Sequence, residues 1–388
     1  MILLDLTHTS HTRARTGVQR VCRALRRSLA TIAEIAPITH DPFRNAWRPL
    51  QAWEDTNLES PAPAPKRGAQ WPLSRRITGR TARWLKRAAP DLPPADALVV
   101  PEIFSPSAAS AFPDLFREIN GPKIALFHDA IALKFPELSP QKTVARFPAY
   151  LRELLMFDGI AAVSEYSRQS LLDYWRWLGV SKHPPVVTIP LGLELPAIRS
   201  DTSAQNPIPI VLCVGSIEGR KNHIALLDAC ERLWTRGLAF ELHLIGLAHA
   251  QTGRTALEKI RALQARGRAL RYDGPQDDAA LDASYGRCDF TVYPSLCEGF
   301  GLPVLESLTH GKPCICSAQG ALGESAIGGG CLTLAGLDAA SIAEAIAQLI
   351  ESPSRRDELR REAASRTYRT WHDYAGELKN WIQTLRRA

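Results

Sequence analysis

Apolar and polar positions along this 388-residue chain alternate in blocks typical of helices that cover a sheet. Short apolar runs predict buried strands of a parallel sheet, and the amphipathic stretches between them predict helices. In the first half the expected strands are 2–6, 97–100, 123–127, 159–163 and 186–190, with helices near 18–30, 141–156 and 164–178. This strand–helix order predicts a doubly wound α/β sheet.

A second series of the same kind begins at residue 208. Its expected strands are 208–214, 240–245, 269–272, 290–293, 313–317 and one near Leu332, with helices near 222–236, 255–266, 277–287, 303–310 and 339–351. We interpret polar residues 193–207 as a linker between two Rossmann-like domains, 1–193 and 207–365, followed by a last helix within 366–388. Two such halves predict a ligand site in a central cleft between them.

Length and composition agree with two domains of a globular protein. The chain is longer than one usual core, and 45% hydrophobic with 22% charged residues is an ordinary composition. No apolar run reaches the ~18 residues of a membrane span, and the N-terminus is too polar beyond Leu6 for a signal peptide. We therefore expect a cytoplasmic protein. Its eight scattered cysteines show no C-x-x-C spacing, and we interpret them as small buried hydrophobes in a reducing compartment.

The net charge of +7 is unevenly placed. Residues 42–95 form a proline-rich insertion, and within it residues 66–90 contain eight basic residues and no acid. Six arginines also lie between Arg13 and Arg27. Such runs indicate an anionic partner, either membrane lipid or nucleic acid.

A basic amphipathic helix is predicted inside the insertion. Ile77, Thr81, Trp84, Leu85 and Ala88 share one face at helical spacing, and basic residues take much of the rest. The pattern predicts a helix that lies in the plane of a membrane. The alternative is a solvated basic helix that packs on its own domain. The residues expected to contact membrane are Arg76, Ile77, Arg80, Arg83, Trp84, Leu85 and Arg87.

The most informative chemistry lies between residues 293 and 313. Glu298 and Glu306 stand eight positions apart, with Gly299-Phe300-Gly301 after the first and Pro303 opening an apolar run. The pattern predicts strand, tight turn and helix. A helix start leaves N–H groups for an anion, and carboxylates accept bonds from hydroxyls, so the expected ligand is both phosphate and sugar.

Two further segments end predicted strands. Gly215 and Ser216 lead to Arg220 and Lys221 at the mouth of a helix, an arrangement suited to a diphosphate, although a surface basic pair is the alternative. The His128-Asp129 pair could supply a general base, a hydroxyl binder or a zinc ligand. No second His or Cys lies at ligand spacing, so we expect no metal there. Gly17, after the first strand, either meets a phosphate or merely starts a helix.

These motifs together resemble one enzyme family. The run EGFGLPVLE at 298–306 is similar to the signature of retaining glycosyltransferases of family four, which have the GT-B fold. Residues 128–137, 162–167, 189–192, 216–222 and 321–324 resemble further motifs of that family, in the same order. The chain departs from the family's pattern at Ser216, Gly219, Leu191 and Gly323, where relatives have Arg, Pro, Asn and Pro.

The resemblance implies a role for each matching residue. Glu298 and His128 would contact the transferred sugar, Arg220 and Lys221 the diphosphate, and Glu306 the ribose; the first four would be the catalytic residues. The last helix would cross back to the first domain. The implied donor-binding residues are Gly17, Gly215, Ser216, Arg220, Lys221, Gly246, Gly274, Glu298, Gly299, Phe300, Gly301, Leu302 and Glu306.

The implied activity is sugar transfer from a nucleotide-diphosphate donor to a lipid-linked saccharide, at the inner face of the cell membrane. The motif around Arg220 resembles bacterial mannosyl- and rhamnosyltransferases of surface polysaccharide assembly, so GDP-mannose is the first choice of donor, with dTDP- or UDP-sugars as alternatives. No cofactor or metal is expected, because the chain has no D-x-D motif. The rival classes are a GT-B epimerase or phosphorylase without a lipid acceptor, and a nucleic-acid-binding module, which would leave the glutamate motif unexplained.

Overall fold

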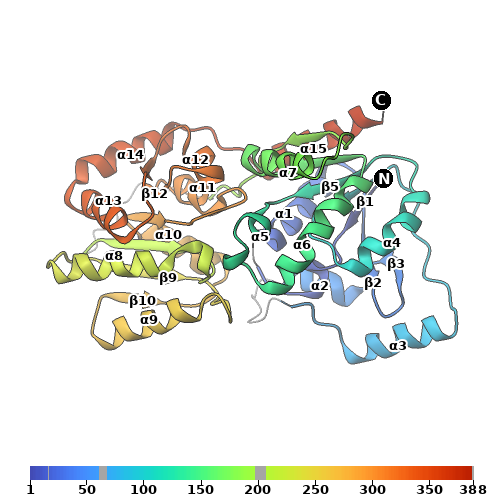
Figure 1. Cartoon of the computed structure of the whole chain (residues 1–388), viewed down its shortest axis with the longest axis horizontal. Helices are drawn as coiled ribbons and strands as arrows, with labels where there is room; N and C mark the ends of the chain where they lie inside the picture. Colours follow the sequence, from blue (N-terminus) through green and yellow to red (C-terminus); the bar gives the residue numbers. More distant parts are fainter. Residues whose placement is uncertain (16, 61–67, 197–206, 387–388) are drawn as a thin grey trace. The chain divides into compact units, whose positions relative to one another are not determined.

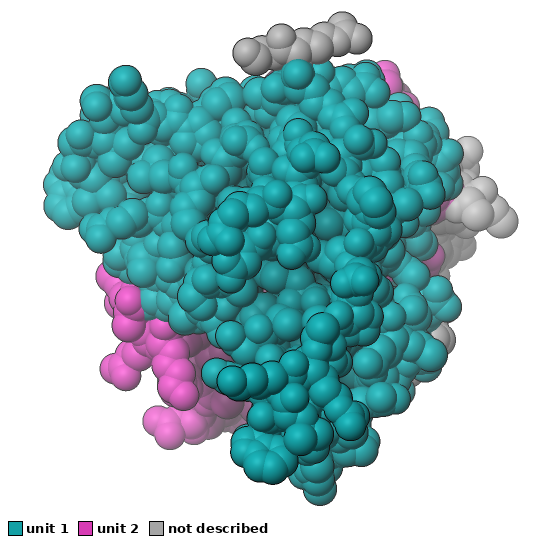
Figure 2. All heavy atoms as spheres, turned by 90° about the vertical axis from the view of Figure 1, so that its right-hand side faces the viewer, with its two compact units in different colours: residues 1–129, 146–192, 370–388 teal, residues 130–145, 193–369 magenta. Residues whose placement is uncertain are grey.

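The computed structural model describes residues 1–15, 17–60, 68–196 and 207–386 (Figure 1). Contacts divide the chain into two units, coloured separately in Figure 2. Unit 1 contains residues 1–129, 146–192 and 370–388, and unit 2 contains residues 130–145 and 193–369. Residues 130–145, which the sequence analysis placed in the first domain, are therefore grouped with unit 2. Most of the expected linker, residues 197–206, lies outside the described residues.

Unit 1 is built on a seven-stranded sheet of order β3-β2-β1-β4-β5-β6-β7. Neighbouring strands are parallel except β2 and β3. The strands are β1 (Ile2–Asp5), β2 (Ile35–Asp41), β3 (Ala46–Pro49), β4 (Ala97–Val100), β5 (Lys123–Phe127), β6 (Gly159–Ala162) and β7 (Val186–Thr188). All residues of β1, β4 and β6 are buried, which is why the sequence shows them as continuous apolar runs.

Helices complete unit 1. They are α1 (Gly17–Ile32), α2 (Ala52–Glu59), α3 (Leu73–Trp84), α4 (Pro106–Arg117), α6 (Gln141–Glu153, in this unit from residue 146), α7 (Glu165–Trp177) and α15 (Trp371–Leu385), with 3-10 turns η1 (Thr9–His11) and η3 (Leu154–Met156). Although α15 follows unit 2 in the chain, it packs on α1. The Nζ of Lys379 on α15 donates a hydrogen bond of 2.5 Å to the carbonyl oxygen of Ile32.

Unit 2 has an all-parallel six-stranded sheet of order β10-β9-β8-β11-β12-β13. Its strands are β8 (Ile210–Val214), β9 (Glu241–Ile245), β10 (Leu270–Tyr272), β11 (Phe290–Tyr293), β12 (Cys314–Ser317) and β13 (Cys331–Leu334). Its helices are α5 (Ile131–Lys134), α8 (His223–Thr235), α9 (Arg254–Ala265), α10 (Asp278–Arg287), α11 (Leu302–Thr309), α12 (Gly320–Ala326), α13 (Ala339–Glu351) and α14 (Pro353–Ser365), with 3-10 turns η2 (Pro136–Leu138) and η4 (Gly219–Lys221).

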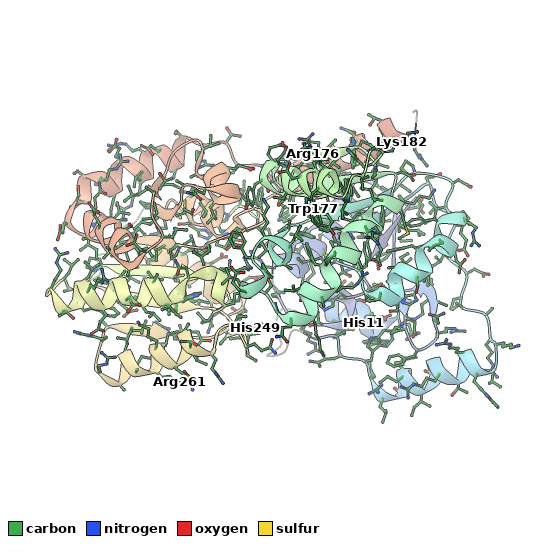
Figure 3. All side chains as sticks on the ribbon, viewed as in Figure 1. His11, Arg176, Trp177, Lys182, His249 and Arg261 are labelled. Carbon is green, nitrogen blue, oxygen red and sulfur yellow. The ribbon has the colours of Figure 1, made fainter. Side chains whose placement is uncertain are left out.

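The insertion 42–95 is more ordered than its composition predicts. The sequence pattern predicts one helix in this segment, whereas the structure adds β3 and α2. The buried Glu54 carboxylate binds Arg48 of β3 at 2.7 Å and His11 of η1 at 2.6 Å. The His11 ring (Figure 3) also contacts the Trp71 ring at a tilt of 31°, with ring centroids 3.9 Å apart. His11 lies 43 residues from Glu54 in the sequence, so local composition could not reveal this contact.

The basic helix α3 is shorter than its apolar pattern predicts. It ends at Trp84, and Lys86 takes a left-handed conformation with φ of 50°. Ala88, which the pattern placed on the apolar face, therefore lies beyond the helix. None of the helices in the described part of the chain combines the length and hydropathy of a bilayer-spanning helix.

Candidate donor site

The two central strands of unit 2 bring the predicted donor-binding segments together. From β8 the chain continues to β9 and β10 on one side, and from β11 to β12 and β13 on the other. Such a switch in strand order leaves a crevice at the carboxyl ends of the two central strands, where α/β proteins bind ligands. The loops carrying Arg220 and Glu298 follow β8 and β11, and the Leu296 N–H donates to the Arg220 carbonyl oxygen at 2.8 Å.

Glu298 is the centre of a charged cluster at these strand ends. Its carboxylate forms ion pairs with both Arg220 and Lys221. Arg220 also pairs with Glu218 at 2.9 Å, and the Ser216 hydroxyl donates to Glu218 at 2.8 Å. The Glu298 side chain is only 11% exposed. The structure therefore places predicted cations and a predicted sugar-binding carboxylate in direct contact.

The cations determine the charge of Glu298. Burial alone would raise its pKa, but Arg220 and Lys221, with a hydrogen bond from Ser295, lower it from 4.5 to about 2. Since the folded-state pKa is depressed, these contacts stabilise the protein above about pH 4.5, and that contribution is lost as the pH falls toward 2. At neutral pH Glu298 is an anion that accepts hydrogen bonds and has no proton to give.

The turn after Glu298 fits the glycines of the motif. Gly301 precedes α11 with φ of 109°, a left-handed conformation that favours glycine. A Cβ there would lie 2.7 Å from the Ser325 hydroxyl oxygen, and that hydroxyl donates to the Phe300 carbonyl oxygen at 2.7 Å. The helix begins at Leu302, and Pro303 occupies its first turn.

Glu306 lies further along α11 and is 8% exposed. The hydroxyl of Tyr285 on α10 lies 3.5 Å from its Oε2, and this hydroxyl is 3.1 Å from that of Tyr293 on β11. The ring of Tyr285 stacks on His310, with centroids 4.6 Å apart. Two buried tyrosines thus support the carboxylate on which ribose binding was predicted.

Three of the predicted glycines line consecutive strand ends. Gly215, Gly246 and Gly274 follow β8, β9 and β10. Backbone hydrogen bonds join these strand ends: the Gly215 N–H donates to the Ile245 carbonyl oxygen and the Gly246 N–H to the Gly274 carbonyl oxygen, both at 2.8 Å. A Cβ on Gly246 would lie 1.9 Å from the Gly215 carbonyl oxygen. The small residues thus allow the loop backbones to approach closely at this edge.

The remaining predicted site residues, His128 and Gly17, belong to unit 1. His128 follows β5, and its Nε2 donates to the Pro101 carbonyl oxygen at 2.7 Å; burial lowers its pKa. Ser167 donates to the His128 carbonyl oxygen at 2.8 Å, and Ser164 caps α7, which explains both serines of the 162–167 motif. Gly17 is the first residue of α1.

Several residues at the strand ends were missed by the sequence analysis. In unit 2 they are Glu218 and Ser295. In unit 1 the buried Glu102, after β4, accepts hydrogen bonds from the N–H groups of His8 at 2.6 Å and Thr9 at 2.7 Å. Glu102 thereby anchors the loop after β1, the neighbouring strand. A single polar residue in each segment gives no recognisable spacing, and only its position after a predicted strand could have identified it.

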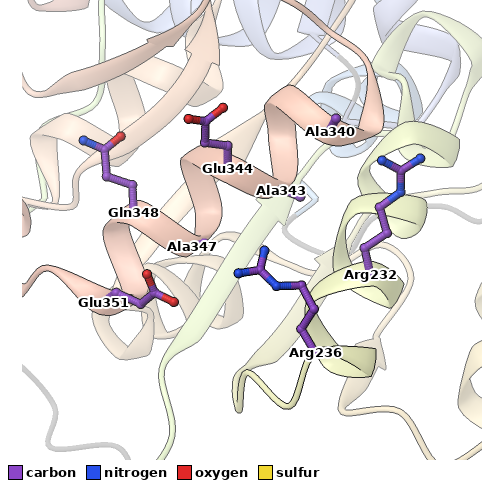
Figure 4. A pocket seen from close by; sticks show the side chains of 8 residues that line it. All are labelled: Arg232, Arg236, Ala340, Ala343, Glu344, Ala347, Gln348 and Glu351. Atoms are coloured by element: carbon purple, nitrogen blue, oxygen red, sulfur yellow. The ribbon is translucent and has the colours of Figure 1, made fainter.

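A hollow elsewhere in unit 2 is separate from this cluster. It lies between α8 and α13 and has a volume of ≈ 610 Å³ (Figure 4). Arg232 and Arg236 line it from α8, and three alanines, Glu344, Gln348 and Glu351 line it from α13. Its lining residues are all different from the predicted donor-binding residues.

Comparison with known proteins identifies the part of the chain that carries the charged cluster. Residues 196–366 match the sequence family described as glycosyl transferases group 1. The matched segment, the group 1 domain, makes up most of unit 2. The cluster of Glu298, Arg220 and Lys221 lies wholly within this group 1 domain.

The chain also resembles a curated protein over most of its length. It is 24% identical over 337 residues to the serotype-specific mannosyltransferase WbdA of Escherichia coli, which covers 81% of this chain but 38% of the relative. The chain therefore spans well under half of the length of that longer protein.

Two solved structures show the same fold over 99% of this chain. Sucrose-phosphate synthase from Thermosynechococcus elongatus has a TM-score of 0.67 at 20% identity and is covered to 98%. Anabaena HepE in complex with UDP-glucose has a TM-score of 0.66 at 14% identity and is covered to 99%. The expected GT-B fold, with two Rossmann-like domains of which the group 1 domain is the second, is confirmed.

Proposed function

We propose that this protein is a retaining, metal-independent glycosyltransferase of bacterial surface polysaccharide assembly. It moves a sugar, with GDP-mannose as the first choice of donor, to a lipid-linked saccharide. The observation that carries this proposal is the contact of Glu298 with Arg220 and Lys221 at the switch point of the group 1 domain.

The cluster supplies what transfer from a nucleoside diphosphate requires. As the bond between sugar and phosphate breaks, the diphosphate gains negative charge, and the two cations stabilise it. The ionised Glu298 accepts hydrogen bonds from sugar hydroxyls next to those cations and thereby orients the sugar. Cations of the protein would take the place of a divalent metal.

The sugar keeps its anomeric configuration if the acceptor hydroxyl attacks the same face of the sugar from which the diphosphate leaves. The departing phosphate oxygen then accepts the hydroxyl proton, the new bond to the sugar forms on that face, and no carboxylate nucleophile is needed. Glu298, with a pKa of about 2, is not suited to act as a general acid. The family resemblance gives His128 the role of a further contact to the sugar.

The choice of donor and acceptor is supported by similarity. WbdA is a mannosyltransferase, and HepE was solved with UDP-glucose, so UDP- and dTDP-sugars are the alternatives to test. A GT-B epimerase or phosphorylase would use the same donor cluster without a lipid acceptor.

A donor screen tests the proposal. The full chain is incubated with GDP-mannose, UDP-glucose and dTDP-rhamnose, and nucleoside diphosphate release is measured without acceptor and with a lipid-linked saccharide extract. We expect one donor to be consumed, faster with extract, and EDTA to leave the rate unchanged. Arg220→Ala and Lys221→Ala should each lower the rate by about 10²–10³-fold. Release of diphosphate from none of the donors, or a rate that EDTA abolishes and Mg²⁺ restores, would contradict the proposal.

We also propose that α3 brings unit 1 to the inner face of the cell membrane. Leu73, Ile77 and Trp84 are 68%, 55% and 81% exposed, so apolar side chains project outward from this basic helix. The helix packs on its own unit through the buried Gly79, and the Arg76 and Arg80 guanidinium carbons lie 5.5 Å from the Phe43 ring centroid. Apolar anchors beside basic residues such as Arg83 suit an anionic lipid surface.

A further inference from the structure

Three cysteines of the group 1 domain gather on two neighbouring strands. Cys314 and Cys316 lie on β12, and Cys331 is the first residue of β13. The strands are parallel, with Cys314 in register with Cys331. The three Sγ atoms all lie within 4.8 Å of one another.

Sheet geometry explains why the three thiols meet. Side chains two residues apart on a strand point to the same face, and residues in register on adjacent strands do so as well. Cys314, Cys316 and Cys331 therefore share one face of the sheet. Their spacing in sequence, C-x-C followed by a cysteine 15 residues later, matches no common metal motif, so the strand pairing is what creates the cluster.

The separation of the sulfurs is close to that of a metal–thiolate site. Three sulfurs bound at about 2.3 Å to a tetrahedral zinc ion lie ~3.8 Å apart. Sulfurs within 4.8 Å of one another reach that geometry through side-chain shifts of about 1 Å or less. We propose that Cys314, Cys316 and Cys331 form a binding site for one thiophilic divalent metal ion of the zinc class.

The surroundings suit entry of an ion from one side and partial neutralisation of its ligands. Cys314 and Cys316 are fully buried, whereas Cys331 is partly exposed and gives access. Three thiolates and a divalent ion carry one net negative charge. Arg366 holds the adjoining turn through a 2.9 Å bond from Nη1 to the Gly329 carbonyl oxygen, which places a cation near that charge.

The metal would support the fold rather than the transfer. It would join β12 to β13. Cys316 is in register with Tyr293 of β11, and the Tyr293 hydroxyl contacts that of Tyr285, the neighbour of Glu306. The fourth coordination position would hold water. Each thiol releases its proton to solvent as its sulfur binds the metal, so binding tightens as the pH rises.

Titration of the reduced, metal-free full chain with Cd²⁺ tests the site. We expect a thiolate-to-metal charge-transfer absorption band that saturates at one ion per chain, with three thiols protected from alkylation. Zn²⁺ should compete with Cd²⁺ and raise the melting temperature. Cys331→Ala, at a partly exposed position, should fold normally and lose the band, the protection and the melting shift.

Cys230→Ala is the matched control, because Cys230 is also a buried free cysteine but lies on α8, outside the cluster. It should bind Cd²⁺ like the unmodified chain. The proposal is overturned if Cys331→Ala still binds one Cd²⁺ with an unchanged band. It is equally overturned if no saturable binding occurs, or if two of the thiols instead form a disulfide in air, shown by the loss of two hydrogens in the mass.

Discussion

At the scale of the residue, the charge on Glu298 is fixed by its neighbours. The sequence predicted a sugar-binding carboxylate and two diphosphate-binding cations in separate segments, because each segment follows a strand and contains residues of the right chemistry. It did not predict that Glu298 pairs with both Arg220 and Lys221, or that Glu218 pairs with Arg220. Contacts between side chains depend on loop geometry, which the pattern of residue types does not encode.

Glu298→Gln should abolish sugar transfer while leaving the fold intact. The amide keeps the shape of the carboxylate but loses the charge that accepts bonds from sugar hydroxyls and opposes the two cations. We expect turnover to fall by about 100-fold or more, with a melting temperature within a few degrees of the unmodified protein. Glu344→Gln, on the exposed side of α13, is the control and should retain full turnover. Near-normal turnover of Glu298→Gln would remove this residue from the site.

Asp5, at the end of β1, should make stability depend on pH. Burial, together with the nearby Glu102 carboxylate, raises its pKa from 3.8 to about 7. The folded protein therefore holds this proton more tightly than the unfolded chain, and stability is lost as the pH rises from about 4 through 7.

Asp5→Asn removes this titration, and the amide oxygen can still accept the bond from the Thr7 N–H. Its unfolding free energy relative to the unmodified protein should rise between pH 4 and 7 and then level off, as urea unfolding would measure. Parallel curves for Asp5→Asn and the unmodified protein would exclude a perturbed Asp5.

At the scale of the element, the apolar runs were sufficient to find the central strands and the edge strand β7 of unit 1, but not β2 and β3 on the other side of the sheet. β1, β4, β5 and β6 are buried on both faces and show as continuous apolar runs. β2 and β3 were missed because their sequences mix apolar and polar residues. β3 is stabilised by the ion pair of its Arg48 with Glu54 of α2. The polar helix α14 was missed for a similar reason: only two of its residues, Leu359 and Ala363, are buried.

The close approach of the loops at Gly215 and Gly246 can be tested by adding one methyl group. Gly246→Ala would place Cβ 1.9 Å from the Gly215 carbonyl oxygen, so the loops after β8 and β9 must separate. We expect a loss of about 2 kcal/mol or more in stability and weaker binding of nucleoside diphosphate, measured by urea unfolding and calorimetry. Gly286→Ala is the control, because Gly286 lies within α10 with open space around it. That change should stabilise the protein by up to about 1 kcal/mol. Equal effects of the two substitutions would refute the close approach.

At the scale of the whole molecule, two exposed tryptophans of unit 1 offer a matched comparison for membrane binding. Trp84 ends the basic helix α3, and Trp177 ends α7 with 78% of its surface exposed (Figure 3). If α3 is the anchor, Trp84→Glu combined with Arg83→Glu should abolish sedimentation with phosphatidylglycerol vesicles, whereas Trp177→Glu should sediment normally. Arg83 is chosen over Arg80 because Arg80 packs on Phe43.

The unmodified protein should sediment much less with neutral vesicles, and salt should weaken binding to anionic ones without eliminating it, because the apolar contacts remain. Equal sedimentation of the α3 double variant would exclude this helix and direct attention to the arginines between Arg13 and Arg27.

The position of α15 on α1 has a consequence for the synthesis of the protein. Unit 1 is assembled from three stretches of chain, and the last of them, residues 370–388, follows all of unit 2. At ordinary translation rates the ribosome needs on the order of ten seconds or more to make the intervening residues. Throughout that interval unit 1 lacks α15. The surface of α1 that α15 later covers therefore stays exposed and accessible to chaperones. The second unit has all its strands by then and can fold before the unit that was begun first.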